Sequence, residues 1–317
     1  MSTKSIAIIG ATGFVGNYFT RYFVGKGYKV YAFGRREKFV LEDLVQHYYS
    51  WDISEGKFES RIQPDIVINC AGSVTHWGQY TQMHKVNTIG TRNIINSFPK
   101  AKFIHISTAS IYDPFKPKDL ITENTVKPIK YLNSYQETKW EAEQEVVNNC
   151  SNYIIFRPHA VYGKNDTTIF PRLIRARKPK LNKFLLIGDG KNRVSLTYVG
   201  NLALAVELAI NYRVKNQIYN IADTKNDTLI NILDKFKVVN NFPEKYLKIN
   251  KHFAWSLAHI LEVNYKLLPF LNEPILTRYV VMQLSSEYTL DITKAKQELN
   301  YHPKENYLNK FQECYGS

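Results

Sequence analysis

Short apolar runs rich in β-branched residues alternate along the chain with segments whose apolar positions follow helical spacing. The helical spacing predicts helices over Asn17–Val24, Met83–Phe98 and Ser134–Asn148. The apolar runs predict strands at Ile6–Ile9, Lys29–Phe33, Ile66–Asn69, Phe103–Ser107, Tyr153–Phe156 and Gln217–Ile221. Such alternation is typical of an α/β fold with a mainly parallel, doubly wound sheet that binds ligands at the C-terminal edge of its strands.

The regular alternation fades after about Arg157, where proline-containing loops and short helices follow one another. We therefore expect a second, smaller and discontinuous α/β lobe above the sheet. The predicted division assigns residues 1–158 and 195–225 to the sheet domain, and residues 159–194 and 226–317 to a substrate-binding lobe.

The first predicted strand ends in a glycine motif, Gly10, Gly13 and Gly16, and helical periodicity begins directly afterwards. Without Cβ atoms in this turn, a phosphate can approach the backbone amides at the positive end of the helix. Because the motif joins a strand to a helix, it favours dinucleotide binding by a Rossmann-type domain over an ordinary turn. The expected cofactor contacts are Gly10, Thr12, Gly13, Phe14, Val15 and Gly16.

The second predicted strand is followed by Gly34, Arg35 and Arg36 rather than by an acidic residue. A carboxylate there usually holds the ribose hydroxyls of NAD, whereas a guanidinium suits the 2′-phosphate of NADP. The sequence thus predicts NADP(H) as the preferred cofactor, with NAD(H) as the alternative; the simpler interpretation is two solvent-exposed arginines. Asp52 and Ile53 follow a further strand-like segment, where Asp52 would hold the adenine amino group.

Tyrosine and lysine four residues apart form a candidate acid–base pair when both lie on one helix. With 22 tyrosines in a lysine-rich chain, chance alone gives roughly two such pairs, and three occur. Tyr22 and Lys26 lie on the first predicted helix, which should run away from the cofactor turn. Tyr112 and Lys116 have Pro114 between them, so they cannot share a regular helical turn.

Tyr135 and Lys139 form the third pair, and of the three only this one lies in an uninterrupted helical segment with credible surroundings. At four-residue spacing the phenol and the ammonium share a face of the helix. An isolated phenol titrates near 10, and an adjacent cation is expected to lower that pKa by about 1–3. The pair is therefore a candidate proton donor and acceptor near neutral pH.

Small hydroxyl side chains follow the strand predicted at Phe103–Ser107. Thr108, supported by Ser107, is placed to hydrogen-bond a reacting oxygen, with a Ser/Thr turn as the simpler alternative. Polar contacts behind the nicotinamide are expected from Asn69, Cys70, Ala71, Gly72 and Asn87.

With these motifs the chain resembles the extended short-chain dehydrogenases/reductases of the NAD-dependent epimerase/dehydratase superfamily. The resemblance covers nearly the whole length and rests on Gly10-x-x-Gly13-x-x-Gly16, Ser107–Tyr112, Tyr135-x-x-x-Lys139 and Arg157–Gly163. It implies that Tyr135 is the acid/base, that Lys139 lowers its pKa and holds the nicotinamide ribose, and that Thr108 polarises the substrate oxygen. Arg157, Pro158 and His159 are expected in the cofactor site as well.

Two positions bear on the branch of the superfamily. Sugar-nucleotide members carry Asn three residues after the arginine that corresponds to Arg157, and Arg-Asp after the Gly-Asp-Gly segment. This chain has Ala160 and Val194 at those positions, and neither offers a polar group to a diphosphate. Arg193, one residue earlier, keeps the sugar-nucleotide alternative open.

The chain is more similar to the 3β-hydroxysteroid dehydrogenase-like branch, which includes sterol-4-carboxylate dehydrogenases and bacterial 2-alkyl-3-oxoalkanoate reductases. The similar segments are Trp77–Tyr80, Arg157–His159, Thr197–Asn201, Leu276–Tyr279 and Leu290–Pro303. The resemblance implies an oxidoreductase that interconverts a secondary alcohol and a ketone on a small hydrophobic substrate, β-keto acyl or sterol-like. The alternatives are a nucleotide-sugar epimerase or dehydratase with tightly bound NAD, and a non-catalytic dinucleotide sensor.

The net charge of +14 contains one dense cluster, whose members are Arg172, Arg175, Arg177, Lys178, Lys180 and Lys183. A solvated basic face is the simplest interpretation, and a contact with an anionic substrate tail or membrane is the alternative. No nucleic-acid-binding motif accompanies the charge, so we expect no nucleic-acid partner.

Cys70, Cys150 and Cys314 are odd in number and lack metal-ligand spacing, which is typical of reduced thiols in a cytoplasmic protein that holds no metal. Neither a signal peptide nor a membrane span is expected, and we expect a homodimer. Apolar residues between Phe253 and Leu271 favour packing within the lobe, with an apolar substrate wall or a peripheral membrane contact as alternatives. Those at helical spacing are Phe253, Leu257, Ile260, Leu261 and Leu268.

Overall fold

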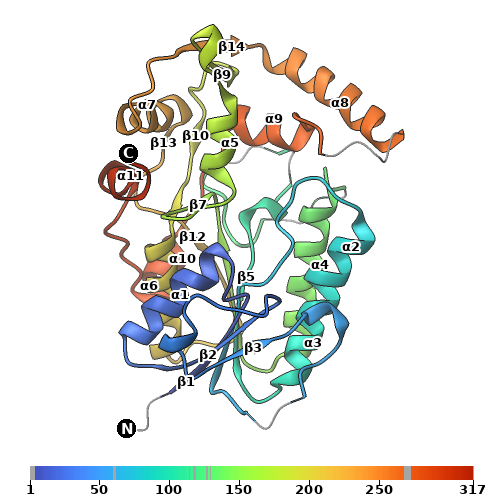
Figure 1. Ribbon diagram of the computed structural model, residues 1–317, viewed down its shortest axis with the longest axis vertical. Coiled ribbons are helices and arrows are strands. Elements are labelled where there is room, and N and C mark those ends of the chain that lie inside the picture. Colours follow the sequence, from blue (N-terminus) through green and yellow to red (C-terminus); the bar gives the residue numbers. More distant parts are fainter. Residues whose placement is uncertain are drawn as a thin grey trace.

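The computed structural model describes residues 4–316 except for 60–61, 114, 117–118, 126–127, 129 and 268–272. Three residues that enter the expectations above lie outside the described residues, namely Pro114, Leu268 and Leu271. The chain forms a lower domain around a sheet and an upper lobe of short elements (Figure 1).

Seven strands of the described residues form one sheet in the order β12-β6-β5-β4-β1-β2-β3, and every pairing in it is parallel. The order reverses direction at β1, as in a Rossmann-type doubly wound sheet, so the fold-class prediction is confirmed. The strands are β1 Ser5–Ile9, β2 Lys29–Gly34, β3 His47–Ser50, β4 Ile66–Asn69, β5 Lys102–Ile106, β6 Tyr153–Pro158 and β12 Gln217–Ile221.

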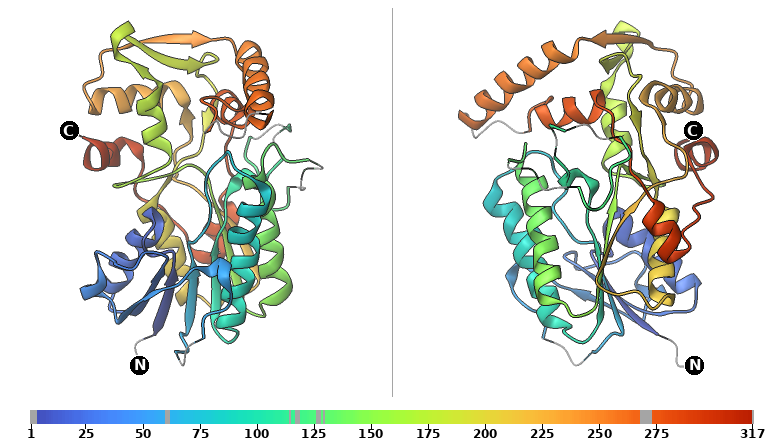
Figure 2. Two further views of the ribbon diagram at one scale, coloured as in Figure 1. Left: turned by 45° about the vertical axis from the view of Figure 1, so that its right-hand side comes forward. Right: turned by 180° about the vertical axis from the view of Figure 1, so that it is seen from behind.

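Helices cover both faces of this sheet (Figure 2). Alternate residues of β1 enter two different cores, since Ile6 and Ile8 join one cluster and Ala7 and Ile9 join the other. A strand buried on both faces reads as a continuous apolar run, which is why the first strand was readily predicted. One face carries α1 Phe14–Gly25, α6 Val199–Asn211 and α10 Thr293–Leu299, and the other carries α2 Tyr80–His84, α3 Gly90–Ser97 and α4 Ser134–Asn149.

Each predicted strand and helix has a counterpart, with ends that differ by a few residues. The predicted helix Met83–Phe98 is a composite, because a π-helical segment, Lys85–Ile89, joins α2 to α3. The edge strand β3 was not among the predicted strands. Of its four residues only Tyr48 is buried, and both ends, His47 and Ser50, are exposed and polar, so they form no apolar run.

The upper lobe is built from short strands and helices that are discontinuous in sequence. β9 pairs in parallel with β14 and antiparallel with β8, and two further pairs, β7 with β11 and β10 with β13, lie nearer the sheet domain. The strands are β7 Val161–Tyr162, β8 Arg177–Lys178, β9 Lys183–Ile187, β10 Arg193–Val194, β11 Thr197–Tyr198, β13 Asp227–Thr228 and β14 Lys245–Ile249. The helices are α5 Ile169–Ala176, α7 Leu229–Val239, α8 Lys251–Leu267, α9 Arg278–Ser285 and α11 Tyr307–Tyr315.

The helix α10 lies within the range 226–317 that we assigned to the lobe, yet it contacts β12 and α6 of the sheet domain. Its C-terminal cap is Asn300 at φ +53°, in the left-handed region that Asn tolerates. The chain therefore returns to the lower domain before α11 rejoins the lobe against α7.

Only a narrow stripe of residues on the helix α8 packs against the rest of the protein. Ala254, Ala258 and Glu262 are buried, whereas Phe253 and Ile260 are 64% and 57% exposed. The apolar positions of this segment thus face outward to a larger extent than packing within the lobe predicts. No helix of the described residues has the length and apolar content needed to cross a membrane.

We expect Gly10→Ala to destabilise the fold. Gly10 has φ +83°, and a Cβ atom there would lie 2.8 Å from the backbone nitrogen of Ala71. A strained conformation of this kind costs about 1–3 kcal/mol, so the free energy of unfolding in urea should fall by at least that amount. Gly25→Ala is the control, because a Cβ atom at this exposed helix end would meet nothing within 4 Å. Equal stability of the two variants would contradict the constraint placed on Gly10.

Candidate active site

The glycine turn between β1 and α1 is an open cradle of backbone amides. The amides of Gly10 and Ala11 both donate to the Phe33 carbonyl at 2.9 Å, which fixes the turn against β2. A Cβ atom on Gly16 would lie 2.2 Å from the Gly10 carbonyl oxygen, so only glycine permits this approach of helix and strand. Because Gly13 caps α1 without any side-chain hydrogen bond, the first amides of the helix remain available to an anion. This geometry fits the diphosphate of a dinucleotide.

The end of β2 lies beside this turn. A Cβ atom on Gly34 would lie 2.8 Å from the Thr12 side chain, so the two segments touch. Arg35 and Arg36 are both exposed. Asp52 accepts hydrogen bonds from the Ser54 amide and hydroxyl at 2.9 and 2.7 Å, and the nearby Arg35 charge helps to lower the pKa of its carboxyl. Arg35 is therefore both solvent-accessible and electrostatically coupled to the strand end.

The polar residues predicted behind the nicotinamide hold the backbone of the loop after β4. Asn69 accepts from the Ala71 amide at 3.0 Å, and Asn87 accepts from the Ser73 amide at 2.7 Å. The Asn87 amide also donates to Thr138 of α4 at 3.0 Å, which ties this loop to the helix that carries Tyr135. Ile53 packs under the same region, where a Cβ atom on Gly90 would lie 2.7 Å from its side chain.

Tyr135 lies in the first turn of α4, which Asn133 caps by accepting from the Gln136 amide at 3.0 Å. The Thr108 side chain lies close enough to Tyr135 to lower the pKa of its phenol. Thr108 follows β5 and is itself fixed, because its hydroxyl oxygen accepts from the Ser110 amide at 3.1 Å. Two hydroxyls from different elements thus converge on one point at the C-terminal edge of the sheet.

Burial raises the pKa of Tyr135, while the Thr108 hydrogen bond and the charge of Arg172 act to lower it. This direction is opposite to the one expected from the four-residue spacing. The Lys139 ammonium instead lies against His105, with Nζ 3.3 Å from Nε2, and donates to the Ile106 carbonyl at 2.9 Å. Burial lowers the pKa of Lys139 to about 8, against the opposing effect of Glu143.

A buried ion pair lies one turn beyond Lys139. Glu143 accepts from Arg157 Nη2 at 2.6 Å, and the two side chains are 0% and 4% exposed. The Ser107 hydroxyl also donates to Glu143, so Ser107 turns away from Tyr135. Arg157 further donates to the Tyr112 hydroxyl at 3.1 Å. The side chains of Ser107 and Arg157, which we predicted to contact the cofactor, are therefore engaged inside the protein.

The segment after Pro158 joins the two domains. The His159 ring lies between the Ser195 carbonyl, 2.7 Å from Nδ1, and Gln283, 3.0 Å from Nε2, and it stacks on Tyr288. Ala160 follows with φ +47°, a left-handed conformation that is unusual for alanine.

The tyrosine hydroxyls of the other two pairs are engaged in hydrogen bonds within the protein. The Tyr22 hydroxyl donates to Glu207 of α6, and the Tyr112 hydroxyl donates to Asn220 of β12 at 2.7 Å. Tyr135, by contrast, lies beside Thr108, which lowers the pKa of its phenol.

A cavity of about 420 Å³ adjoins the N-terminal turn of α4. Its lining combines the loop after β4 with α8 and α9, and it is rich in aromatic rings. Tyr279 connects this cavity to the catalytic candidates, because its hydroxyl lies 2.9 Å from the Ser110 hydroxyl and it affects the pKa of Tyr135. The aromatic lining residues are His76, Trp77, Tyr80, Tyr265 and Tyr279.

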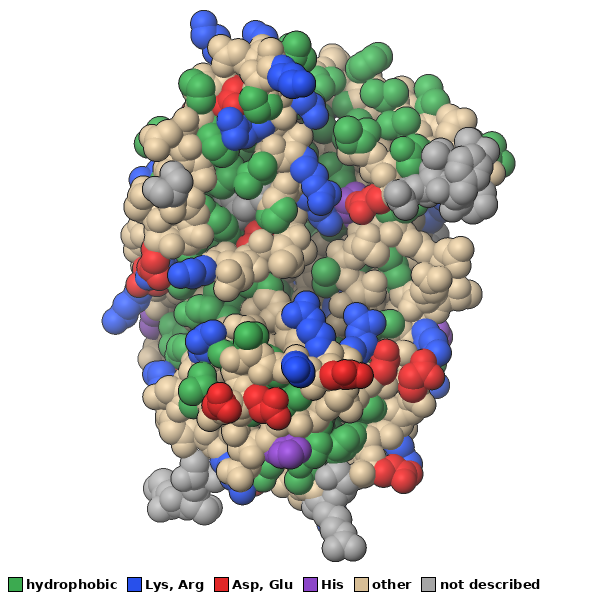
Figure 3. Space-filling model, in the orientation of Figure 1, with side chains coloured by type: hydrophobic (Ala, Val, Ile, Leu, Met, Phe, Trp, Pro, Cys, Tyr) green, Lys and Arg blue, Asp and Glu red, His purple; other side chains and the backbone are tan. Residues whose placement is uncertain are grey.

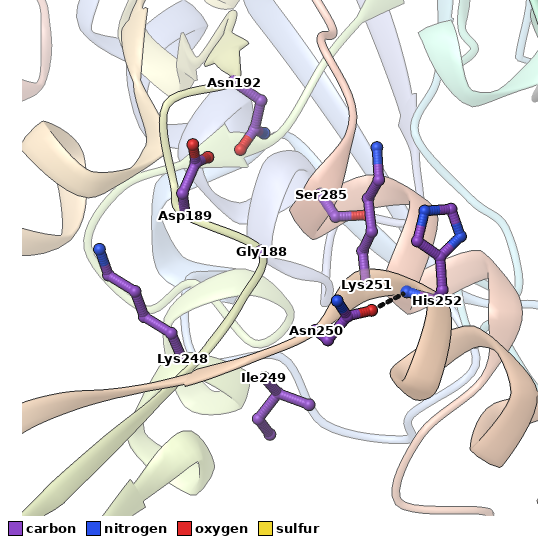
Figure 4. Close-up of a pocket in the computed structure, with 9 residues that line it drawn as sticks. All are labelled: Gly188, Asp189, Asn192, Lys248, Ile249, Asn250, Lys251, His252 and Ser285. Atoms are coloured by element: carbon purple, nitrogen blue, oxygen red, sulfur yellow. Dashed lines mark hydrogen bonds between the residues drawn. The ribbon is translucent and has the colours of Figure 1, made fainter.

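A second cavity, of about 460 Å³, lies in the upper lobe between β9, β14 and α8 (Figure 4). Its lining is mostly polar, and Asn250 accepts there from the His252 amide at 2.9 Å. Figure 4 shows the ammonium groups of Lys248 and Lys251 pointing in different directions rather than toward one centre. Neither cavity is lined by Tyr135, Lys139 or Thr108, but the lining of the aromatic cavity includes Ser134, which directly precedes Tyr135.

Four residues of this region were not singled out from the sequence as site residues. His105 and Glu143 contact Lys139 and Ser107, and Tyr279 and His76 line the aromatic cavity. For Glu143 a signal was present, since it continues the four-residue spacing of Tyr135 and Lys139 along one helix face. Tyr279 lies on the short helix α9 and His76 lies in the loop after β4, and no periodic pattern in the sequence marks either residue.

Comparisons with known proteins agree with this geometry. The chain is 27% identical over 315 residues to a 2-alkyl-3-oxoalkanoate reductase of Shewanella oneidensis, covering 93% of this chain and 81% of that protein. It is also 27% identical over 325 residues to a decarboxylating sterol-4-alpha-carboxylate 3-dehydrogenase of Dictyostelium discoideum, covering 96% and 98%.

Solved structures with the same fold include a UDP-glucuronic acid 4-epimerase from Bacillus cereus in complex with NAD. Its TM-score is 0.72 at 18% identity, and the match covers 97% of this chain and 94% of that chain. A dTDP-glucose 4,6-dehydratase from Bacillus anthracis has a TM-score of 0.69 at 17% identity, with 98% and 95% covered.

The model of the NAD dependent epimerase/dehydratase family matches residues 6–222, which is more than half of the chain. The match contains the glycine cradle, Thr108, Tyr135 and Lys139. The chain therefore belongs to the NAD dependent epimerase/dehydratase family.

Proposed function

We propose that the protein is an NAD(P)-dependent oxidoreductase that interconverts a secondary alcohol and a ketone on a hydrophobic substrate. The observation that carries the proposal is that Tyr135 and Thr108 lie close together beside an aromatic cavity. The names of the relatives support it, since one is a reductase of 2-alkyl-3-oxoalkanoates and another a sterol-4-alpha-carboxylate dehydrogenase.

The hydroxyls of Tyr135 and Thr108 have different roles at the reacting oxygen. In the direction of reduction, Tyr135 donates its proton to the ketone oxygen, while Thr108 holds that oxygen by a hydrogen bond. A nicotinamide cofactor held at the glycine cradle would supply or accept the hydride at the carbon attached to this oxygen. In the direction of oxidation Tyr135 accepts the alcohol proton instead. Because burial raises its pKa, Tyr135 is held in the protonated form that reduction requires.

Lys139 lies one helical turn from Tyr135, and its pKa of about 8 lets it exchange a proton near neutral pH. We propose that it holds the ribose hydroxyls of the cofactor and supports the charge of Tyr135 when the phenol has lost its proton. His105, Asn69 and Thr91 form a chain of hydrogen-bonded side chains behind it, which fixes its direction.

For the cofactor we propose a preference for NADP(H). Arg35 follows the last residue of β2, is exposed, and lies beside the glycine cradle through the contact of Gly34 with Thr12. A free guanidinium at this position offers charge-assisted hydrogen bonds to a 2′-phosphate.

A nucleotide-sugar substrate is disfavoured by three side chains near the domain junction. Val194 is buried and apolar, and Ala160 has no hydrogen-bonding group. Arg193, which could have replaced a missing phosphate ligand, is half exposed and forms ion pairs with Asp119 at 2.8 Å and Glu287 at 2.6 Å. A non-catalytic sensor is disfavoured because it would need neither the Thr108 hydroxyl nor a hydrogen-bonded Tyr135.

For location we propose the cytoplasm. Cys70, Cys150 and Cys314 are free thiols, which is usual in a reducing compartment.

Replacing Tyr135 by Phe should lower turnover by about a hundredfold or more, because the proton donor is removed while the ring that fills the site remains. Cofactor binding, measured by quenching of protein fluorescence, should be retained. Tyr22→Phe removes a hydroxyl of the same kind at a structural contact and should leave turnover within a few-fold. Near-normal activity of Tyr135→Phe would rule out the proposed mechanism.

Replacing Arg35 by Ala should weaken NADPH binding by about 1–3 kcal/mol, the value of a lost charge-assisted contact, and should change NADH binding much less. Titration of both cofactors by calorimetry measures the difference. Lys38→Ala, at an exposed position three residues further on, serves as the control. If the unchanged protein binds both cofactors equally, the proposed preference is wrong.

The substrate class is tested with long-chain β-keto esters in NADPH oxidation and with the matching secondary alcohols in NADP reduction. Turnover is expected because burying an alkyl chain against the aromatic lining gains about 25 cal/mol per Å². UDP-glucose and dTDP-glucose should not raise the melting temperature. Saturable micromolar binding of either sugar nucleotide, without turnover of any hydrophobic ketone, would overturn the assignment.

A further inference from the structure

His105 is a buried histidine of β5 that lies behind Lys139, and the proposed reaction does not use its ring proton. The residue is 1% exposed. Its Nδ1 lies 3.2 Å from the side-chain nitrogen of Asn69, and its Nε2 lies 3.3 Å from Lys139 Nζ. Both ring nitrogens thus face nitrogen atoms that ordinarily donate hydrogen bonds. Because a neutral imidazole has one N–H group and one lone pair, one of these two neighbours must accept a hydrogen bond from the ring.

The side-chain amide of Asn69 decides which neighbour accepts. Its oxygen accepts from the backbone amide of Ala71 at 3.0 Å, and because that group can only donate, the orientation of the side-chain amide is fixed. Its nitrogen donates to the Thr91 hydroxyl at 3.2 Å, and that hydroxyl donates its own hydrogen to the Asn87 carbonyl at 2.6 Å. The second hydrogen on the Asn69 nitrogen therefore points to His105 Nδ1. It follows that Nδ1 carries a lone pair and no proton.

The ring proton of His105 must then lie on Nε2 and point at Lys139. Burial keeps the pKa of His105 well below its usual value, so the ring is neutral and has only this one proton. An ammonium group offers hydrogens and no lone pair, so it would meet the Nε2 hydrogen with a hydrogen of its own. A neutral amine accepts from Nε2 and still donates to the Ile106 carbonyl at 2.9 Å. The hydrogen bonds around His105 therefore balance only when Lys139 is a neutral amine.

The charges around Lys139 agree with this state. Lys139 is 5% exposed, and no ion pair of the described residues includes it. Glu143, which favours the ammonium, is bound by Arg157, and burial keeps the Cys70 thiol protonated by raising its pKa. Burial of Lys139 itself lowers its pKa to about 8. Figure 3 shows basic side chains at the surface, above and below the hollow between the two lobes, where water stabilises their charge. Lys139 lacks that stabilisation.

We propose that His105 is a positioning residue that holds Lys139 as a neutral amine by donating a hydrogen bond from Nε2. Lys139 can take up a proton only by leaving this contact, so the charge of its side chain is coupled to its position. The consequence for catalysis rests on the proposed function. A neutral Lys139 does not favour the phenolate of Tyr135, which therefore keeps the proton that it gives to a ketone.

The first test uses the unchanged protein without cofactor. In 15N NMR of histidine-labelled protein, His105 should show a protonated Nε2 and an unprotonated Nδ1, and His105→Gln identifies its signals by their loss. In a pH titration of 13C-labelled lysine, the Lys139 side chain, identified with Lys139→Arg, should titrate at about 8 or below, whereas an ordinary lysine titrates near 10.4. The His105 signals should change in the same titration.

Two variants change the proposed contact in different ways. His105→Phe keeps a ring but removes the Nε2 hydrogen, so the pKa of Lys139 should rise by about 1, the effect of one lost hydrogen bond. Asn69→Asp offers a carboxylate to Nδ1, so the proton of the His105 ring should move to Nδ1 and Nε2 should accept from a charged Lys139. His47→Phe is the control, because it makes the same replacement at an exposed position of β3 and should leave Lys139 unchanged.

The pH dependence of alcohol oxidation with NADP separates this role from a structural one. Oxidation requires the Tyr135 phenolate, so a charged Lys139 in His105→Phe should move the pH–rate profile to lower pH. A purely structural defect would lower the rate at every pH and leave the profile in place, and that result would contradict the proposed role.

The NMR measurements decide the inference even if the variants are unstable. A proton on His105 Nδ1 in the unchanged protein, or a Lys139 that titrates at the ordinary lysine pKa, would overturn it. Failure to convert any hydrophobic ketone or alcohol would refute the proposed function instead. The two failures are distinguishable, because the state of His105 and Lys139 is measured without cofactor or substrate.

Discussion

The buried ion pair of Glu143 and Arg157 is the constraint on which the geometry of the active site depends. Both side chains are almost without exposure, and removing one partner of such a pair typically costs about 3–5 kcal/mol. Glu143 is satisfied by Arg157 of β6 and by Ser107 after β5. Glu143 can contact both Arg157 and Ser107 only if α4 has one particular position along its axis and one rotation about it. Tyr135 lies two turns before Glu143 on that helix, so the same contacts place its hydroxyl beside Thr108.

Burial has opposite effects on the two proton-carrying groups of α4. It disfavours the phenolate of Tyr135 and the ammonium of Lys139, so the pKa of the first rises and that of the second falls to about 8. As a result, both side chains can adopt their neutral forms near neutral pH. The charges that could reverse this trend are already engaged, since Glu143 binds Arg157, which leaves Arg172 as the cation that favours the phenolate.

The sequence was sufficient for the parts of the protein that repeat a physical pattern. The strand β1, the glycine turn and α1 follow from an apolar run, three glycines and helical spacing, and Tyr135 was separated from Tyr22 and Tyr112 by its helical context. Contacts that join distant segments were not accessible in this way. The side chains of Phe103, His105 and Ser107 share a face of β5, as strand geometry requires, but nothing local shows that α4 covers it. Arg157 was consequently expected at the cofactor, whereas it binds Glu143.

We expect substrate choice to reside in the less regular half of the chain. The sheet domain supplies Thr108, Tyr135 and Lys139 from regular elements, and structures of sugar-nucleotide enzymes share its fold at 18% identity or less with TM-scores near 0.7. The lobe supplies Tyr279 from α9, for which no sequence periodicity gives a location. Ala160 illustrates the separation: its backbone adopts φ +47°, a conformation that Asn tolerates better than Ala. The junction therefore keeps its backbone conformation at some cost in strain, although the side-chain amide that would bind a diphosphate is absent. We therefore expect selectivity at this junction to depend on which side chains project from a common backbone.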